Sequence, residues 1–225
     1  MSCSKSEPSN DSRMEPMQFA DITGVILAGG ASSRMGRNKA LLLVDGIPLI
    51  EKIYRTMAEL FDNLLLVTNT PEEYAFLPCR KVGDIYRGVG SIAGLHAGLT
   101  ASSTQRIFIV ACDTPFLNAS LIRKICSIDG NAAAVVPVGR SGKEPLHALY
   151  GKDCLPALEQ MLVQDIRKIL HLYEQVPTRF VMPEEFSSIA EAELSFYNLN
   201  TPAEYQALHP PKAFQEDQER GAEPI

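Results

Sequence analysis

The sequence predicts an α/β protein, a three-layer sandwich built around a mostly parallel, Rossmann-like sheet. Two features of the chain support this prediction. Short runs of consecutive apolar residues alternate along the sequence with amphipathic segments of helical period. These runs are apolar at successive positions rather than at every second one, which is typical of strands covered by helices on both faces.

The predicted elements follow one another without an internal repeat or a low-complexity linker. Residues 22–28 are the first buried strand, and residues 48–61, whose apolar side chains recur near helical spacing, are the first helix. Further strands are expected at 64–67, 106–111, 132–137, 146–150 and 196–199. Further helical segments are expected at 71–74, 91–99, 118–128, 155–162, 166–172 and from Pro202 onward. Ser91 and Asn118 are the expected N-caps of two of these helices.

Length and composition indicate one globular domain. The 225 residues are 45% hydrophobic, which is enough to bury a sizeable core. We expect a single domain over residues 21–208, between a disordered N-terminal tail (1–20) and a flexible C-terminal tail (209–225), because both ends are polar and rich in Ser, Pro or charge.

Charge and cysteine content restrict the classes of function. A formal net charge of −6 argues against a nucleic-acid-binding protein, and no apolar run is long enough to cross a membrane. The five cysteines form no C-x-x-C pair, and the first residues lack the apolar stretch of a secretory signal. We therefore expect free thiols and a cytoplasmic location.

The loop after the first strand has the features of a phosphate-binding loop. Gly29 and Gly30 allow a ligand to approach the backbone closely, and backbone N–H groups can surround a phosphate. Arg34, Arg37 and Lys39 add three cations within six residues. The spacing matches neither the P-loop nor the dinucleotide-binding glycine pattern. The alternative interpretation is a solvated Gly/Ser loop with incidental charges.

Polar residues also follow the later strands, where ligands bind in open α/β sheets. A role as helix N-cap or turn residue would explain Asn69, whereas Asp84 is either a turn residue or an acceptor of hydrogen bonds from a base or ribose. The glycine-rich segment 88–94 enters a helix whose N-terminus can face an anion. Asp113 ends the strand 106–111, where a carboxylate can hold Mg²⁺ together with substrate phosphates, although an Asp-Thr-Pro turn would also explain it.

Five segments, in the same order, resemble nucleotidyltransferases that act on molybdopterin, and most closely the molybdenum cofactor guanylyltransferases. The segments are L-A-G-G-x-S-x-R-M-G-x-x-K-x-L-L at 27–42, G-S-I-A-G at 90–94, A-C-D-T-P-F at 111–116, E-P-L-H-A-L-Y at 144–150 and N-L-N-T-P-A-E at 198–204. The likeness covers residues 22–207 and implies a fold of the nucleotide-diphospho-sugar transferase type.

The resemblance implies a reaction and a role for each matching residue. GMP would pass from GTP to the molybdopterin cofactor, giving its guanine dinucleotide form and pyrophosphate, with Mg²⁺ as cofactor. The implied nucleotide-binding residues are Leu27, Ala28, Gly29, Gly30, Lys39, Asn69, Asp84 and Asp113. Lys39, Arg34 and Asp113 would be catalytic, with the metal on Asp113, and Asn198 and Asn200 would lie on the pterin side. Proteins that deliver molybdopterin or mature molybdoenzymes are the expected partners.

Two segments depart from the family pattern, and one further residue has two interpretations. The family's asparagine after the second strand aligns with Val67, and Asn69 is the nearest candidate for its role. Ser91 and Ile92 replace the usual Pro-Leu pair. The resemblance would also put His147 near the pterin side, but a lone histidine in an apolar strand is more often a core residue, and His147 is interpreted as one.

The same residues distinguish this function from its alternatives. Molybdopterin cytidylyltransferases usually carry L-A-A-G, whereas this chain has L-A-G-G at 27–30; the additional glycine, Gly29, leaves room for the larger purine and favours GTP. Sugar-phosphate nucleotidyltransferases share L-A-G-G but usually continue G-T-R-L. A non-catalytic nucleotide-binding protein would lose the metal carboxylate, yet Asp113 is present. An NAD-dependent oxidoreductase would need the missing glycine fingerprint.

Overall fold

The computed structural model describes residues 18–29, 38–199, 204 and 207. The predictions for Gly30, Arg34, Arg37 and Asn200 lie outside these residues, as do those for the C-terminal tail. Within the predicted N-terminal tail, Phe19 and Ala20 are part of the first strand, so the sheet begins three residues before the predicted strand 22–28.

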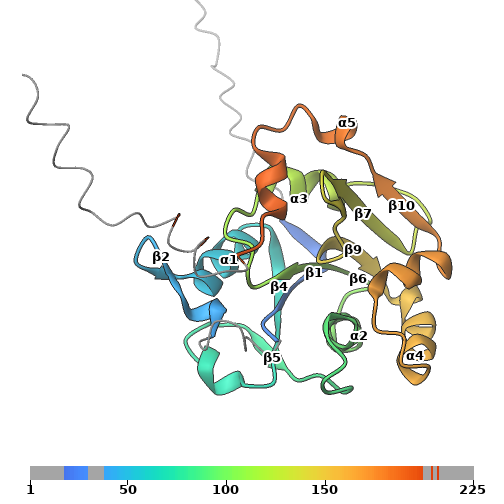
Figure 1. The fold of residues 1–225 in the computed structure, drawn as a ribbon, viewed down its shortest axis with the longest axis horizontal. Coiled ribbons are helices and arrows are strands. Elements are labelled where there is room, and N and C mark those ends of the chain that lie inside the picture. Colours follow the sequence, from blue (N-terminus) through green and yellow to red (C-terminus); the bar gives the residue numbers. More distant parts are fainter. Residues whose placement is uncertain (1–17, 30–37, 200–203, 205–206, 208–225) are drawn as a thin grey trace, which may run out of the picture.

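One eight-stranded sheet runs through the centre of the described residues (Figure 1). Its order is β10-β7-β9-β6-β1-β4-β5, and β8 pairs with β7. The strands are β1 (Phe19–Leu27), β4 (Phe61–Val67), β5 (Arg80–Val82), β6 (Arg106–Ala111), β7 (Ala134–Gly139), β8 (Gly142–Lys143), β9 (His147–Gly151) and β10 (Thr178–Val181). Pairs among β5, β4, β1 and β6 are parallel, as is β7 with β10, whereas β9 is antiparallel to both its neighbours. The mostly parallel sheet is confirmed.

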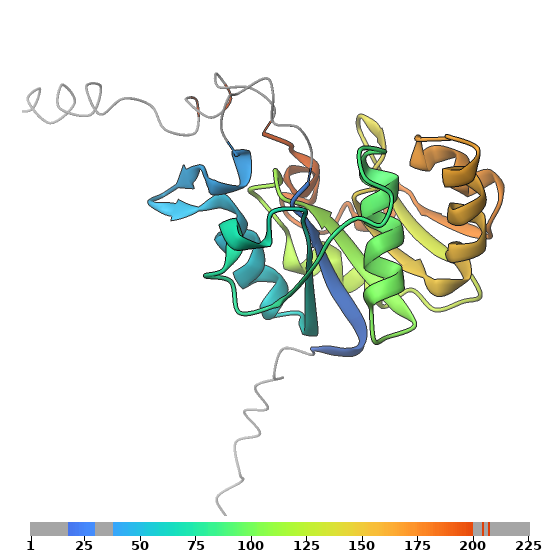
Figure 2. The same cartoon turned by 90° about the horizontal axis from the view of Figure 1, so that it is seen from below.

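Helices cover both faces of this sheet, and the strand residues alternate between them. Ile26 and Phe108 pack with α1 (Leu49–Ala58) and α3 (Ala119–Cys126) on one face. Val25 and Ile107 pack on the other face with α2 (Ser91–Ala101) and α4 (Leu155–Val163), which lie side by side (Figure 2). The short α5 (Pro183–Phe186) joins the first face. The three-layer sandwich is confirmed, because both faces bury apolar side chains.

Strand register brings four carboxyl ends into one row. Leu27 pairs with Val67 on one side and with Ala111 on the other, and Val67 pairs with Val82. The chain therefore leaves β1, β4, β5 and β6 at the same edge of the sheet. Whatever follows these strands is collected at that edge, which is where open α/β sheets bind ligands.

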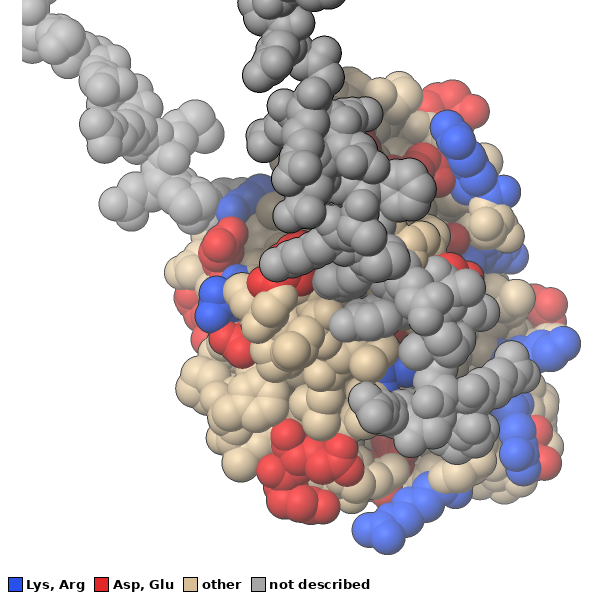
Figure 3. Space-filling view, turned by 60° about the vertical axis from the view of Figure 1, so that its left-hand side comes forward, with Lys and Arg blue, Asp and Glu red and all other residues tan. Residues whose placement is uncertain are grey.

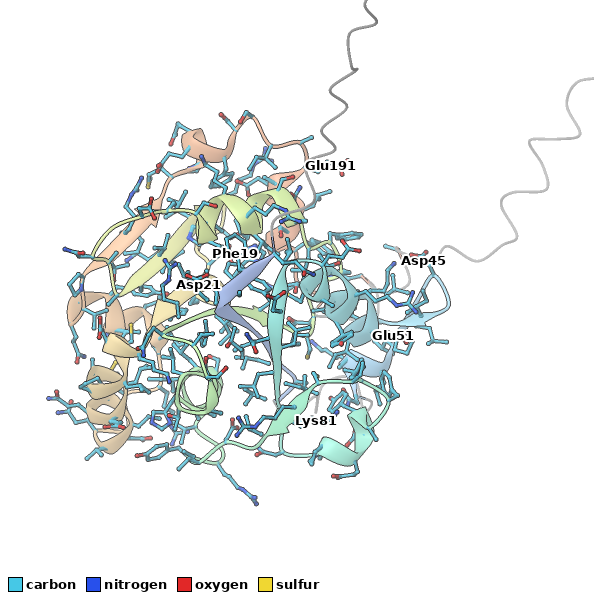
Figure 4. All side chains as sticks on the ribbon, turned by 180° about the vertical axis from the view of Figure 1, so that it is seen from behind. Phe19, Asp21, Asp45, Glu51, Lys81 and Glu191 are labelled. Carbon is cyan, nitrogen blue, oxygen red and sulfur yellow. The ribbon has the colours of Figure 1, made fainter. Side chains whose placement is uncertain are left out.

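A two-residue hairpin, β2 (Leu43–Val44) and β3 (Ile47–Pro48), precedes α1 and was not predicted. Asp45 and Gly46 have φ of 55° and 78°, as in the type I′ turn that Asp-Gly favours. Asp45 lies at the outer tip of the hairpin (Figure 4), where it pairs with Lys52 of α1. The Asp-Gly pair was thus a usable signal in the sequence.

Two predicted helix boundaries are wrong. The first helix ends at Ala58 rather than at residue 61, because Phe61 begins β4 and pairs with Phe19. The N-cap of α2 is Gly90, with φ of 91°, rather than Ser91. A left-handed backbone at the helix entry favours glycine over a residue with a side chain. The N-cap role of Asn118 is confirmed, since its Oδ1 accepts from the Leu121 N–H at 3.1 Å.

The last third of the domain differs most from expectation. The predicted strand 196–199 is wrong: Ala192–Phe196 is a 3-10 helix, and Leu199 makes one backbone hydrogen bond to Asp113 O, at 2.8 Å, instead of joining a ladder. The predicted helix 166–172 is a 3-10 helix at Ile169–Glu174. The edge strand β10 was not predicted, because four residues are too few to show a period.

Acidic and basic side chains of the described residues are interspersed on the face shown in Figure 3, and they form no continuous basic surface there. Among the described residues, none of the helices has the length and apolar character needed to cross a membrane.

Candidate functional site

A cavity of about 1130 Å³ opens at the carboxyl edge of the sheet. It collects residues that the sequence scatters over more than 170 positions. Every described residue among the predicted site residues lines it: Leu27, Ala28, Gly29, Lys39, Asn69, Asp84, Asp113 and Asn198. The register of the parallel strands explains this convergence, because each of these residues follows a strand end or packs against one.

The end of β1 forms the floor of the cavity. The Ala28 N–H donates to Val67 O at 2.9 Å, which prolongs the sheet by one residue before the chain turns away. A Cβ on Gly29 would meet nothing within 4 Å, so the backbone there is open to a ligand. A Cβ on Gly94 would come within 3.1 Å of Leu27, so this glycine lets α2 pack closely on β1.

Lys39 enters the cavity from a 3-10 helix, Lys39–Leu41. Asn38 caps this helix, accepting from the Ala40 N–H at 3.1 Å, and its Nδ2 donates to Tyr74 Oη at 2.8 Å. Lys39 Nζ donates to Leu199 O at 3.2 Å, which ties the end of the glycine loop to the C-terminal part of the domain. Neither Asn38 nor Tyr74 was predicted as a site residue; only the Asn-Lys-Ala start of a helix could have indicated the cap.

Asn69 and Asp84 meet at the ends of β4 and β5. Asn69 Nδ2 donates to Asp84 Oδ2 at 3.1 Å, and the Asp84 N–H donates to Asn69 Oδ1 at 3.0 Å. Burial raises the pKa of the Asp84 carboxyl, while the Asn69 hydrogen bond and the charge of Arg87 act in the opposite direction. Val67, at the aligned family position, lines the same cavity.

Asp113 lies just beyond β6, which is on the other side of β1 from β4 and β5. Burial raises the pKa of its carboxyl, and the nearby Lys39 charge partly offsets that effect. Thr114 Oγ1 donates to Ala111 O at 2.8 Å, so the segment is a stabilised turn as well as a carboxylate site. Burial raises the pKa of Cys112 to about 12, which leaves a neutral thiol beside Asp113.

The opposite end of the cavity, beside β9, contains residues that the sequence analysis did not assign to the site. Glu144, Ser195 and Phe196 line it together with His147. His147 is 2% exposed, and its Nε2 lies 3.3 Å from Ser195 Oγ. Burial lowers the pKa of His147 to about 3, so the ring is neutral. Its interpretation as a core residue is confirmed, although its ring also borders the cavity.

Among the described residues, no three His, Cys, Asp or Glu side chains are grouped as a metal site. Asp113 is a cavity-lining carboxylate just beyond the end of β6, with the charge of Lys39 nearby. One or two protein carboxylates suffice for Mg²⁺ when substrate phosphates and water supply the other ligands. A half-buried, cavity-lining carboxylate fits that chemistry.

Comparisons with known proteins agree with this geometry. The family model described as "MobA-like NTP transferase domain" matches residues 24–178. Molybdenum cofactor guanylyltransferase of Desulfosudis oleivorans is 35% identical over 82% of this chain and 93% of its own length. Probable molybdenum cofactor guanylyltransferase of Carboxydothermus hydrogenoformans is 35% identical over 84% of this chain and 95% of its own.

A solved structure extends the agreement to three dimensions. Molybdopterin-guanine dinucleotide biosynthesis protein A of Archaeoglobus fulgidus superposes with a TM-score of 0.73 at 26% identity, covering 83% of this chain and 96% of that one. The expected fold of the nucleotide-diphospho-sugar transferase type is thereby confirmed. From its sequence, its fold and these likenesses, the chain belongs to the MobA-like NTP transferase family.

Proposed function

We propose that this protein transfers GMP from GTP to the molybdopterin cofactor, forming the guanine dinucleotide cofactor and pyrophosphate. One observation carries the proposal: a single cavity, at the row formed by Leu27, Val67, Val82 and Ala111, is lined by all the described residues that the family pattern singles out. The names of the relatives support the choice of substrates.

We assign the two substrates to different parts of the cavity by the order of the strands. GTP would lie over β1, β4 and β5, with its base and ribose toward Asn69 and Asp84. Molybdopterin would lie over β6 and β9, toward Asn198. The α-phosphate of GTP would then be near Asp113 and Lys39, where the two halves of the cavity meet.

The side chains of this protein would position the substrates and offset the charge of their phosphates, rather than act as a covalent nucleophile. The terminal phosphate of molybdopterin attacks the α-phosphorus of GTP in line; the new P–O bond forms as the bond to pyrophosphate breaks. No general base is needed, because the attacking phosphate is already ionised. Lys39 offsets negative charge on the phosphates, a task that Arg34 would share.

Asp113 is the residue that would hold Mg²⁺, and its half-buried carboxylate fits that ion, as described above. When bound, the metal supplies charge neutralisation on the phosphate oxygens. Lys39 remains close to Asp113, so the charges of carboxylate, cation and phosphates can balance within one region.

The experiment that tests the proposal is thermal denaturation with each nucleoside triphosphate in the presence of Mg²⁺. A ligand that binds only the native state stabilises it by about 2.7 kcal/mol at 100 times its Kd. GTP should produce the largest shift. A larger shift with CTP would indicate a cytidylyltransferase, and no shift with any nucleotide would indicate a non-catalytic protein.

Domain limits, partners and location complete the proposal. Residues 21–208 would act as one nucleotidyltransferase domain, extended at its start by the first residues of β1. Molybdopterin-delivering proteins and molybdoenzyme-maturation proteins would be its partners in the cytoplasm. The acidic net charge of −6 supports the absence of nucleic acid among its ligands.

A further inference from the structure

The cavity continues past Asp113 to an end that contains Glu144, a residue to which the family resemblance gives no role. Asp84 follows β5 and Glu144 precedes β9, and β4, β1 and β6 lie between those two strands. Four strand spacings separate β5 from β9, about 19 Å. Glu144 is therefore beside the second substrate, on the far side of Asp113 from the proposed base-binding residues.

The Glu144 carboxylate is half-buried in the cavity wall. Among the residues that the structure describes, none donates a hydrogen bond to it or forms an ion pair with it. The neighbouring cation, Lys143, is directed elsewhere, with Nζ 4.6 Å from the ring centre of Phe180. Burial and the charge of Glu193 raise the pKa of Glu144, so holding this carboxylate here is costly.

Backbone contacts fix where Glu144 stands. Its N–H donates to Pro137 O at 3.0 Å, and its carbonyl accepts from the His147 N–H at 3.2 Å. A Cβ on Gly139 would lie 3.2 Å from Glu144 Oε1, so the glycine at the end of β7 leaves room for the carboxylate. The position is thus built by the fold rather than left to a free surface side chain.

A second polar group at the same end also lacks a partner. His147 Nδ1 is buried and makes no hydrogen bond to any described residue, and His147 lines the cavity next to Glu144. A buried donor or acceptor without a partner is costly unless a ligand or water satisfies it. The half-buried carboxylate of Glu144 is three residues away, and the two groups together indicate a binding subsite.

We propose that Glu144 is a specificity-determining residue for the second substrate, and that its carboxylate accepts hydrogen bonds from the 2-amino group and the adjacent ring N–H of the pterin. This inference rests on the proposed function, which supplies the pterin. The two donors are adjacent and parallel, and an ionised carboxylate accepts such a pair through both oxygens. Guanine presents the same two donors, but its proposed place is at Asp84, four strands away.

Matched pteridines test the proposal directly. Pterin carries the 2-amino group, whereas lumazine has a carbonyl oxygen at that position and would face the carboxylate with a second acceptor. The wild type should bind free pterin roughly ten- to a hundredfold more tightly than lumazine, the range for hydrogen bonds to a charged group. In Glu144→Gln, whose amide can donate to the lumazine carbonyl, this preference should disappear or reverse.

The control variant is Glu184→Gln, the same change at an exposed carboxylate of α5. It should keep the wild-type preference, and thermal melts of both variants check that they are folded. The KM for molybdopterin should rise at least tenfold in Glu144→Gln while the KM for GTP stays within twofold. Failure of the wild type to bind pterin, equal affinity for the two pteridines, or an unchanged preference in Glu144→Gln would overturn the inference.

GTP binding separates this inference from the proposed function. If GTP stabilises the wild type but the pteridine preference is unchanged in Glu144→Gln, only the role of Glu144 fails. If GTP does not bind and the preference for pterin still depends on Glu144, the proposed reaction fails and the pterin subsite stands. A large loss of GTP affinity in Glu144→Gln would place guanine at this end and overturn the assignment.

Discussion

Asn69 and Asp84 are joined by two hydrogen bonds of 3.1 and 3.0 Å, one between their side chains and one from the Asp84 backbone to the Asn69 amide. Each residue follows a different parallel strand, so the pair closes the gap between the ends of β4 and β5. A Cβ on Gly83 would lie 3.2 Å from Asn69 Oδ1, so that glycine allows the amide to reach its partner. The family's asparagine aligns with Val67, yet Asn69 holds the carboxylate.

Replacing Asn69 by Ala should weaken GTP binding at least tenfold. Asp84 would lose its side-chain donor and the fixed orientation that goes with it, and stability should fall by about 1 kcal/mol for the lost hydrogen bonds. Calorimetric titration with GTP and Mg²⁺ measures the affinity. The control is Asn63→Ala, at an exposed position of β4, the strand that precedes Asn69. This change should leave GTP affinity unchanged. Unaltered affinity in Asn69→Ala would remove this pair from the nucleotide site.

Asp113→Ala should lower turnover at least about a hundredfold, the scale of losing one electrostatic stabiliser. The carboxylate would no longer hold Mg²⁺ near the phosphates, so added metal should not restore the rate. Release of pyrophosphate gives the measurement. Asp129→Ala, at an exposed loop position, provides the matched control. Near-normal turnover in Asp113→Ala would exclude Asp113 from the metal role.

Lys39→Ala should reduce both GTP affinity and turnover, each by at least about tenfold, because the same cation contacts the phosphates in the ground state and in the transition state. The hydrogen bond from Lys39 to Leu199 O would also be lost, so a thermal melt must accompany the kinetics. Lys52→Ala, on the outer side of α1, controls for the loss of a lysine. Kinetics that match the wild type in Lys39→Ala would argue against a phosphate-binding loop.

His147 should make the protein sensitive to acid. Burial lowers its pKa to about 3, below the unfolded value of 6.5. Between those values the unfolded chain binds the proton and the folded chain does not, so stability falls as pH decreases below 6.5, by up to about 1.4 kcal/mol per pH unit. Urea unfolding at pH 7 and pH 5 measures the slope.

In His147→Gln this pH dependence should become shallower, since the side chain no longer titrates. The control is His171→Gln, an exposed histidine whose removal should leave the slope unchanged. A wild-type slope retained in His147→Gln would mean that other groups cause the acid sensitivity.

Local pattern was enough for the main outline of the fold. Consecutive apolar residues, as at Val25 and Ile26, indicate a strand buried on both faces, and these two side chains do enter opposite cores. The N-cap role of Asn118 in α3 could also be predicted from the sequence, because its hydrogen bond to Leu121 spans only three residues. Asp84 and Asp113 could be singled out because each follows an apolar run.

The part of the candidate site that is made by contacts between residues distant in the chain could not be predicted from the sequence. Asn38 reaches Tyr74, and Lys39 reaches Leu199, across separations of 36 and 160 residues. Glu144 shows nothing unusual in the sequence, since its lack of a partner depends on what surrounds it. The antiparallel direction of β9 and the place of the edge strand β10 could likewise not be predicted from local pattern, because both are set by pairing with β7.

The sequence by itself determined the fold class, the order of most elements and the residue types available at the strand ends, because helices and strands follow from local periodicity. Only the tertiary structure decided which of those residues share a cavity. Register in a parallel sheet is set by packing between strands that are distant in the chain, and it is this register that places Leu27 beside Val67 and Ala111. The candidate site is the consequence of that alignment.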